Sequence, residues 1–146
     1  MAYSRDVASA EALARKCFVA AVDKAGAPYI GHCERVVGRL EEPEYKVVGW
    51  LHDVVEDTEV TIDEIRAEFG SDTAAAVEAI THREGEPWED YIERVKSNPV
   101  AKAVKISDLI DNSNLSRLPV VRPKDALRQK KYNRTLCYLM DIEPGL

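Results

Sequence analysis

No stretch of the 146-residue sequence approaches the roughly 18 consecutive apolar residues that a membrane-spanning helix needs. The first residues also lack the apolar core of a secretory signal peptide. Cysteine is scarce: Cys17, Cys33 and Cys137 show no paired spacing, and their odd number does not fit a disulfide framework. These absences argue against a membrane protein and a disulfide scaffold, and they predict a cytoplasmic protein with reduced, mostly buried thiols.

An excess of basic residues is also lacking, because 20 Lys and Arg stand against 26 Asp and Glu, for a net charge of -6. A general nucleic-acid surface would need a basic patch, so no nucleic-acid partner is expected. A small phosphorylated ligand stays compatible with this charge, since a local pocket can override it. No Gly-rich phosphate loop is present, which argues against a kinase or synthetase. The sequence does not indicate the oligomeric state or the regulation of the protein.

What the chain does have is helical periodicity almost throughout, with apolar residues three and four apart. Strand-like alternation and internal repeats are missing. Residues 1–146 are therefore predicted to form a single all-α domain, a helical bundle. The expected helices span residues 8–24, 29–40, 44–57, 61–70, 72–80, 87–95, 99–112 and 123–140, with Thr61, Ser71 or Asp72, and Asn98 as caps.

The most informative segment reads His-Asp-Val-Val-Glu-Asp at residues 52–57, inside a stretch rich in Val, Trp and Leu. On a helix, residues four apart share a face, so His52 would align with Glu56 and Asp53 with Asp57. Burying each of these charges without a partner would cost free energy on the order of several kcal/mol. A bound cation would avoid that cost, and the segment therefore indicates a metal site.

His32 and Asp108 join His52 and Asp53 as candidate metal ligands, because each lies on a predicted helix in apolar surroundings. Taken alone, His32 could be an ordinary core or surface histidine, and Asp108 could simply pair with Lys105 one turn earlier. The combination of His, then His-Asp, then Asp favours the metal site. Two imidazoles and two carboxylates suit Mn²⁺, Fe²⁺ or Zn²⁺.

This H…HD…D pattern resembles that of HD-domain phosphohydrolases, and in detail it resembles the RelA/SpoT-type hydrolase domains and the small alarmone hydrolases. The resemblance extends over roughly residues 10–140. It is carried by three segments: Gly-Ala-Pro-Tyr-Ile-Gly-His at 26–32, Leu-His-Asp-Val-Val-Glu-Asp-Thr at 51–58, and Lys-Ile-Ser-Asp at 105–108 followed by Asn112.

The resemblance implies an enzyme that removes the 3′-pyrophosphate from guanosine tetra- or pentaphosphate with the help of a manganese ion. It assigns His32, His52, Asp53 and Asp108 as ligands of that ion. Glu56 and Asp57 would orient or deprotonate the attacking water. The substrate would contact Lys24, Tyr29, Lys105 and Asn112.

Two positions depart from the family pattern and bear on the substrate rather than the chemistry. Asp23 stands where several alarmone hydrolases carry an arginine that can pack on the guanine base, and it would repel a phosphate. Leu109 stands where an arginine commonly follows the last metal ligand. A hydrolase of another nucleotide or phosphoester therefore remains an alternative, as does a non-catalytic nucleotide sensor. The intact Glu56-Asp57 pair argues against the sensor.

The last third of the chain is locally basic. A solvated helix face or the rim of a polyphosphate pocket would each explain this composition. The residues concerned are Arg117, Arg122, Lys124, Arg128, Lys130, Lys131 and Arg134.

Overall fold

The computed structural model describes residues 2–142, and in this part of the chain the regular structure is helical. The all-α prediction is therefore confirmed. A lone backbone bridge between Val22 and Pro28 is the sole strand-like pairing in the described part. The helices are α1 (Ala2–Cys17), α2 (Ile30–Gly38), α3 (Pro43–Leu51), α4 (Val54–Asp57), α5 (Ile62–Phe69), α6 (Ser71–Ile80), α7 (Trp88–Ser97), α8 (Pro99–Asn112), the 3₁₀ turn η1 (Leu115–Arg117) and α9 (Pro123–Leu139).

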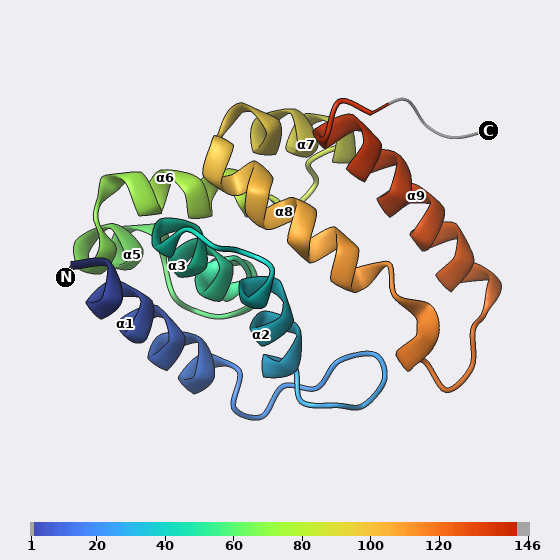
Figure 1. The fold of residues 1–146 in the computed structure, drawn as a ribbon, viewed down its shortest axis with the longest axis horizontal. Helices are drawn as coiled ribbons and strands as arrows, with labels where there is room; N and C mark the ends of the chain where they lie inside the picture. Colours follow the sequence, from blue (N-terminus) through green and yellow to red (C-terminus); the bar gives the residue numbers. More distant parts are fainter. Residues whose placement is uncertain (1, 143–146) are drawn as a thin grey trace.

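Helix α8 runs through the middle of the molecule, with α2 and α3 on one side and α7 and α9 on the other (Figure 1). Its start is set by sequence, because the Asn98 side chain accepts hydrogen bonds from the backbone N–H groups of Val100 and Ala101, and Pro99 occupies the first turn. The interior of this helix is apolar, with Ala101 and Val104 fully buried. Polar side chains near its C-terminal end are consequently held inside the bundle.

Helices α2 and α3 approach each other closely at Gly49. A Cβ atom at this position would lie 3.0 Å from side-chain carbons of both Leu40 and Val37. Any larger residue would push the two helices apart. This close packing places His32 of α2 beside His52 at the end of α3, with 5.5 Å between the ring centroids.

The helix predicted for residues 8–24 is wrong at its C-terminal end, since α1 stops at Cys17. The Asp23 side chain instead folds the following loop by accepting hydrogen bonds from the backbone N–H groups of Ala25 and Ala27. Gly26 supports the turn with a φ of +84°, which is available to glycine at little cost. Lys24 consequently lies on a loop between α1 and α2.

The continuous helix predicted for residues 44–57 is also wrong, because α3 ends at Leu51 and α4 begins at Val54. The His52 ring explains the break: its Nδ1–H donates to the Gly49 carbonyl oxygen at 2.7 Å, in competition with the backbone ladder. The face-sharing argument for His52 with Glu56 does not hold across this turn. It does hold for Asp53 with Asp57, because the Asp57 backbone N–H donates to the Asp53 carbonyl oxygen at 2.9 Å and their carboxylates lie close together. The site is built by the turn itself.

The remaining helix signals are largely confirmed. Thr61 caps α5 by accepting a hydrogen bond from the Glu64 backbone N–H, as its spacing predicts. Helix α6 differs slightly, because Gly70 takes the cap position that Ser71 or Asp72 was expected to fill. In the described range, 2–142, no helix is both long and apolar enough to cross a membrane.

Candidate metal centre

The side chains of His32, His52, Asp53 and Asp108 converge from α2, the α3–α4 turn and α8. One ligand atom from each lies within 4.8 Å of the others. The Nε2 atoms of His32 and His52 lie 2.9 Å and 3.3 Å from Asp108 Oδ1, and His52 Nε2 lies 3.1 Å from Asp53 Oδ2. The structure thus brings together the four residues singled out from the sequence, and their role as ligands stays a prediction.

The hydrogen bonds of the two histidines leave their Nε2 atoms available to a metal. His52 Nδ1 must carry a proton because its partner, the Gly49 carbonyl oxygen, can only accept. His32 Nδ1 lies 2.7 Å from the Asp111 carboxylate, which likewise accepts. Both Nε2 atoms therefore point toward the cluster, in the tautomer that metal-binding histidines adopt when a carbonyl or carboxylate holds Nδ1.

Asp111 is a site residue that sequence reasoning missed. Its side chain is buried and accepts hydrogen bonds from the guanidinium of Arg35, at 2.7 and 3.2 Å, as well as from His32. Burial works against charge on His32, but hydrogen bonds to Asp108 and Asp111 outweigh it and raise the His32 pKa to about 9. The sequence feature that could have identified Asp111 is its position three residues after Asp108 on a largely apolar helix, which places the two on one helix face.

Asp53 and Asp108 concentrate negative charge at the centre of the cluster. Burial, together with the neighbouring Asp108 carboxylate, raises the pKa of Asp53 well above its usual range. Asp108 keeps a low pKa in spite of its burial, because the Lys105 ammonium lies 3.0 Å from Oδ2 and the protonated His32 donates to Oδ1. Crowded acids of this kind are stabilised by a cation.

The donor set fits a divalent metal ion. Two imidazole nitrogens and two carboxylates meet in a largely buried position, and both imidazoles present an unprotonated lone pair once His32 is neutral. Binding of a divalent ion would replace the proton that otherwise joins His32 to Asp108. Nitrogen and oxygen ligands in this proportion suit Mn²⁺, Fe²⁺ and Zn²⁺.

Glu56 and Asp57 stand next to this centre on α4, exposed to solvent. Together with Asp53 they form a second group whose carboxylate oxygens lie within 4.8 Å of one another. Glu56 is oriented by the backbone N–H of His82, which donates to its carboxylate at 2.8 Å. Burial and the neighbouring Glu56 raise the pKa of Asp57.

His82 holds a supporting position beside Glu56. Its Nε2–H donates to the Glu86 carbonyl oxygen at 2.8 Å, and its ring stacks on Tyr91 with centroids 4.5 Å apart. This anchoring fixes the backbone N–H that holds Glu56. The contact joins residues 26 positions apart, so only the folded chain reveals it.

Two cavities adjoin the cluster, and a third shares lining residues with one of them. The metal-side cavity, about 230 Å³, is lined by the His52-Asp53 turn, Glu56, Asp57, His82, Lys105 and Asp108. The central cavity, about 330 Å³, lies beside it and shares Asn112 and Tyr132 with it. The cationic cavity, about 400 Å³, shares Lys24, Leu118 and Arg128 with the central cavity. Volumes of this order suit a small ligand.

The four residues expected to contact a substrate lie around these cavities. Lys24, Tyr29 and Asn112 line the central cavity, and Lys105 lines the metal-side cavity. The Tyr29 hydroxyl also donates to Asp53, and the Asn112 amide donates to Asp108 at 3.1 Å. Lys105 lies over the rings of Trp88 and Tyr91, 5.5 and 5.1 Å from their centroids. Substrate contact by these residues remains a prediction.

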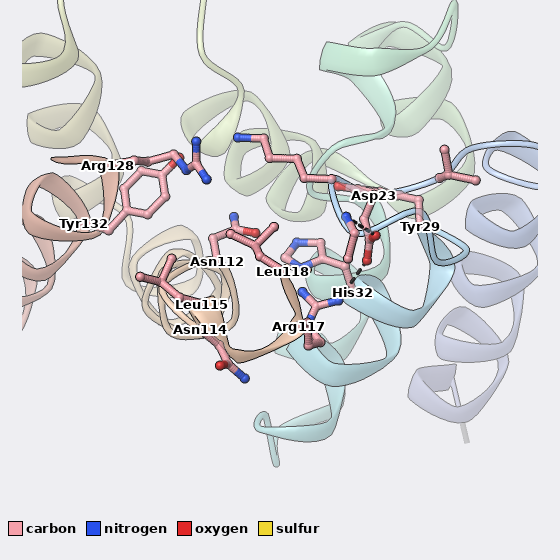
Figure 2. A pocket seen from close by; sticks show the side chains of 13 residues that line it. Asp23, Tyr29, His32, Asn112, Asn114, Leu115, Arg117, Leu118, Arg128 and Tyr132 are labelled. Carbon is pink, nitrogen blue, oxygen red and sulfur yellow. Dashed lines mark hydrogen bonds and ion pairs between the residues drawn. The ribbon is translucent and has the colours of Figure 1, made fainter. Parts of the chain in front are cut away.

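Asp23 lies at the rim of the central cavity, where Figure 2 shows its side chain joined to that of Arg117. Arg117 Nη1 donates to Asp23 Oδ2 at 2.8 Å, while Oδ1 accepts the two backbone N–H groups of the loop. The expectation that Asp23 repels a phosphate therefore needs correction, because a guanidinium neutralises its charge. The partner lies 94 residues away in the sequence.

Comparisons with known proteins give a consistent result, although no family model matches the chain. It is 33% identical over 129 residues to the probable guanosine-3′,5′-bis(diphosphate) 3′-pyrophosphohydrolase of Synechocystis sp., covering 82% of this chain and 17% of that protein. It is 33% identical over 101 residues to guanosine-3′,5′-bis(diphosphate) 3′-pyrophosphohydrolase MESH1 of Danio rerio, covering 62% of this chain and 56% of that one. The chain thus spans a sixth to about half of these relatives.

Solved structures show the same fold. A metazoan ortholog of SpoT, described as hydrolyzing ppGpp, superposes with a TM-score of 0.73 at 20% identity over 90% of this chain and 85% of that chain. A crystal structure of a Listeria monocytogenes protein matches with a TM-score of 0.59 at 31% identity, over 82% and 85% of the two chains.

The helical fold and the histidine–aspartate cluster define the class of HD-domain hydrolases, whose fold this chain shares with the SpoT ortholog. Within that class the sequence relatives narrow the assignment. The chain belongs to the RelA/SpoT-type hydrolase family.

Proposed function

We propose that the protein is a metal-dependent phosphohydrolase that removes the 3′-pyrophosphate from guanosine tetra- or pentaphosphate. The observation that carries this proposal is the position of Glu56 and Asp57 beside the cluster of His32, His52, Asp53 and Asp108. Two adjoining cavities offer room for a nucleotide next to those carboxylates. The sequence relatives of the chain are named for this reaction.

Four residues would hold the ion: His32, His52, Asp53 and Asp108. When bound, a divalent ion would supply a Lewis acid that polarises a phosphoryl oxygen and lowers the pKa of water. Manganese is the ion we propose, with Fe²⁺ and Zn²⁺ compatible with the same donors.

The chain's own groups would position the reactants and move the proton. Glu56, held by the His82 backbone N–H, is placed to accept a proton from an attacking water. Asp57 beside it would orient that water. Lys105 is mostly buried, and the neighbouring Asp108 raises its pKa, so it would carry a positive charge that offsets the negative charge building up as the ribose 3′-oxygen leaves the phosphorus and takes up a proton. Tyr29 and Asn112 would contact the sugar or phosphates from the central cavity.

The test is a panel of nucleotides assayed with Mn²⁺, with product identification. Release of pyrophosphate from guanosine tetraphosphate supports the proposal, whereas orthophosphate from simpler nucleotides would assign a different substrate. Saturable binding without turnover would identify a sensor.

Two substitutions separate metal binding from catalysis. Asp53→Asn should abolish Mn²⁺ binding in calorimetry and turnover together. Glu56→Gln should keep Mn²⁺ binding yet lower kcat by about 100-fold or more, the usual contribution of a general base. Glu59→Gln, an exposed acid three residues further on, is the matched control and should retain full activity. Full activity in Glu56→Gln would show that its proposed role is wrong.

A further inference from the structure

The hydrogen bond that orients Glu56 comes from a loop rather than from a helix. Residues 81–87 join α6 to α7, and His82 near the start of this loop donates its backbone N–H to Glu56 Oε1 at 2.8 Å. Connecting loops are usually more mobile than the helices they join, and a mobile donor would not hold a carboxylate in one place. The position of Glu56 beside the metal cluster therefore depends on what fixes the His82 peptide group.

Arg94 of α7 contacts both ends of this loop. Its Nη2 donates to the Thr81 carbonyl oxygen at 2.7 Å and to Glu86 Oε1 at 2.9 Å, and its Nη1 donates to the other oxygen of Glu86. The Glu86 carboxylate also accepts a hydrogen bond from the Arg83 backbone N–H at 3.2 Å. A guanidinium that bonds both oxygens of a carboxylate is fixed in orientation as well as in place, because its donors form a rigid fork.

The Thr81 carbonyl and the His82 N–H belong to the same peptide group. This peptide bond is trans, so the group is planar and its C=O and N–H point in opposite directions. Arg94 holds the carbonyl oxygen on one side, and the N–H is thereby directed at Glu56 on the other side. A cation bonded to the carbonyl also polarises the peptide group and strengthens the hydrogen bond that its N–H donates.

Tyr91, three residues before Arg94 and on the same face of α7, fixes the adjoining carbonyl group. The Tyr91 hydroxyl donates to the Ile80 carbonyl oxygen at 2.6 Å, and its ring stacks on the His82 ring with centroids 4.5 Å apart. The last carbonyl groups of a helix have no partner within the helix, and at the end of α6 two side chains of α7 supply the partners. Two consecutive carbonyl groups ahead of the His82 N–H are thus held by α7.

Arg94 itself lies outside the metal-side cavity. Glu56, His82 and Tyr91 line this cavity, and Arg94 is not among its lining residues. The Arg94 side chain is 21% exposed and that of Glu86 is 12% exposed, so water competes little for their contacts. An effect of Arg94 on the reaction would therefore pass through the peptide group that it holds and not through contact with a substrate.

We propose that Arg94 is a positioning residue for Glu56. By holding the Thr81 carbonyl oxygen, it directs the His82 N–H at the Glu56 carboxylate. Glu86 supports this role, because it keeps the guanidinium in the orientation that reaches Thr81. The proposal rests on the proposed function for the role of Glu56 as the group that accepts a proton from water. It adds a residue outside the metal centre that determines how precisely Glu56 faces it.

Arg94→Met removes the guanidinium donors and keeps a long side chain at this position. It should lower kcat for guanosine tetraphosphate by about tenfold, the loss expected for one hydrogen bond to a charged group, and change KM by about twofold at most. Mn²⁺ binding in calorimetry should stay as in the parent protein. Arg66→Met, which removes an arginine from an exposed pair with Asp63 on α5, is the matched control and should keep full kcat.

A double-mutant cycle with Glu56→Gln separates positioning from a general structural effect. In the Glu56→Gln background no proton acceptor remains to be positioned, so Arg94→Met should lower the residual kcat by about twofold at most. A residue that only stabilises the fold would lower kcat by the same factor in both backgrounds. Glu86→Gln also breaks the ion pair, but it leaves the Arg94 donor to Thr81 in place and should lower kcat less than Arg94→Met does.

The His82 amide proton supplies a measurement that needs no turnover. Its NMR chemical shift in the isotope-labelled protein without metal should move upfield in Arg94→Met, because the hydrogen bond to the Glu56 carboxylate weakens, and should not move in Arg66→Met. If Arg94→Met does not fold, Arg94→Lys takes its place in every comparison. A single ammonium lacks the planar fork that bonds Glu86 and Thr81 together, so the same pattern is expected with smaller losses.

An unchanged kcat in Arg94→Met, or an equal loss of kcat in the Glu56 and Glu56→Gln backgrounds, would overturn the proposal. So would a His82 amide shift that is the same in Arg94→Met and in the control. If the parent protein turns over no guanosine nucleotide, the proposed function fails, while the His82 amide shift still tests whether Arg94 directs this N–H.

Discussion

Removal of Arg117 tests whether the acid at the rim of the central cavity depends on its guanidinium partner. In the structure Arg117 Nη1 donates a hydrogen bond to Asp23 Oδ2 at 2.8 Å, and the Asp23 side chain is only 12% exposed. The Asp23 pKa is held below its usual range: burial opposes the charged form, but the hydrogen bond from Arg117 and the two loop N–H groups outweigh it. Arg117→Ala would leave a mostly buried carboxylate without its counter-charge.

The magnitude follows from the exposure of the two partners. Breaking a fully buried pair costs about 3–5 kcal/mol, and breaking an exposed pair costs about 1 kcal/mol or less. Asp23 is mostly buried but the Arg117 side chain is 33% exposed, so we expect Arg117→Ala to lower the free energy of unfolding by about 1–2 kcal/mol. Asp23→Asn with Arg117→Ala should recover about 1 kcal/mol of this loss, because the asparagine oxygen can still accept from Ala25 and Ala27.

The double-mutant cycle is measured by urea denaturation and by guanosine 5′-diphosphate binding. In the binding assay the single variant Arg117→Ala should bind about fivefold more weakly than the double variant, since an unpaired carboxylate at the central cavity would repel a bound phosphate by about 1 kcal/mol. Arg134→Ala, an exposed arginine on α9, is the control. Additive effects on stability, or a double variant that binds no better than the single one, would refute the argument.

Three further changes have defined outcomes. Asp111→Asn removes the carboxylate that orients His32 and should weaken Mn²⁺ binding by about tenfold in calorimetry, whereas Asp72→Asn on the exposed face of α6 should not. Saturating Mn²⁺, at about 100 times its Kd, should stabilise the protein by about 2.7 kcal/mol, and Asp53→Asn should abolish this gain in thermal unfolding. The hydrogen bond from Arg94 lowers the pKa of Glu86 to about 2, below the value near 4.3 in the unfolded chain. The ionised Glu86 therefore stabilises the folded protein fully above about pH 4.5, and this stabilisation is lost as the pH falls toward 2. Urea denaturation across this range should show Glu86→Gln less stable than the parent at pH 6, with a difference that closes near pH 2.

Local sequence signals were sufficient to predict most of the helices. Caps at Thr61 and Asn98 and the periodic apolar faces were enough to define most of the helices, because these features depend on neighbours within one or two turns. Both errors lie where a side chain bonds to nearby backbone groups. The Asp23 side chain accepts from backbone N–H groups of the loop after α1, and the His52 ring donates to the Gly49 carbonyl oxygen, which a continuous helix would use. Periodicity cannot detect this competition.

The candidate ligands were visible in the sequence because each one is a polar residue in an apolar segment, a local contrast. The groups that orient His32, Asp23 and Glu56 were not visible there, since Asp111, Arg117 and His82 act across separations of 79, 94 and 26 residues. Their partners become defined only in the folded chain. This difference also explains why Asp23 was misjudged: its charge is a property of the pair. For the same reason, we expect variants of Arg117, whose charge is paired with Asp23 at the central cavity, to change ligand affinity. Variants of the four candidate ligands should instead change whether turnover occurs at all.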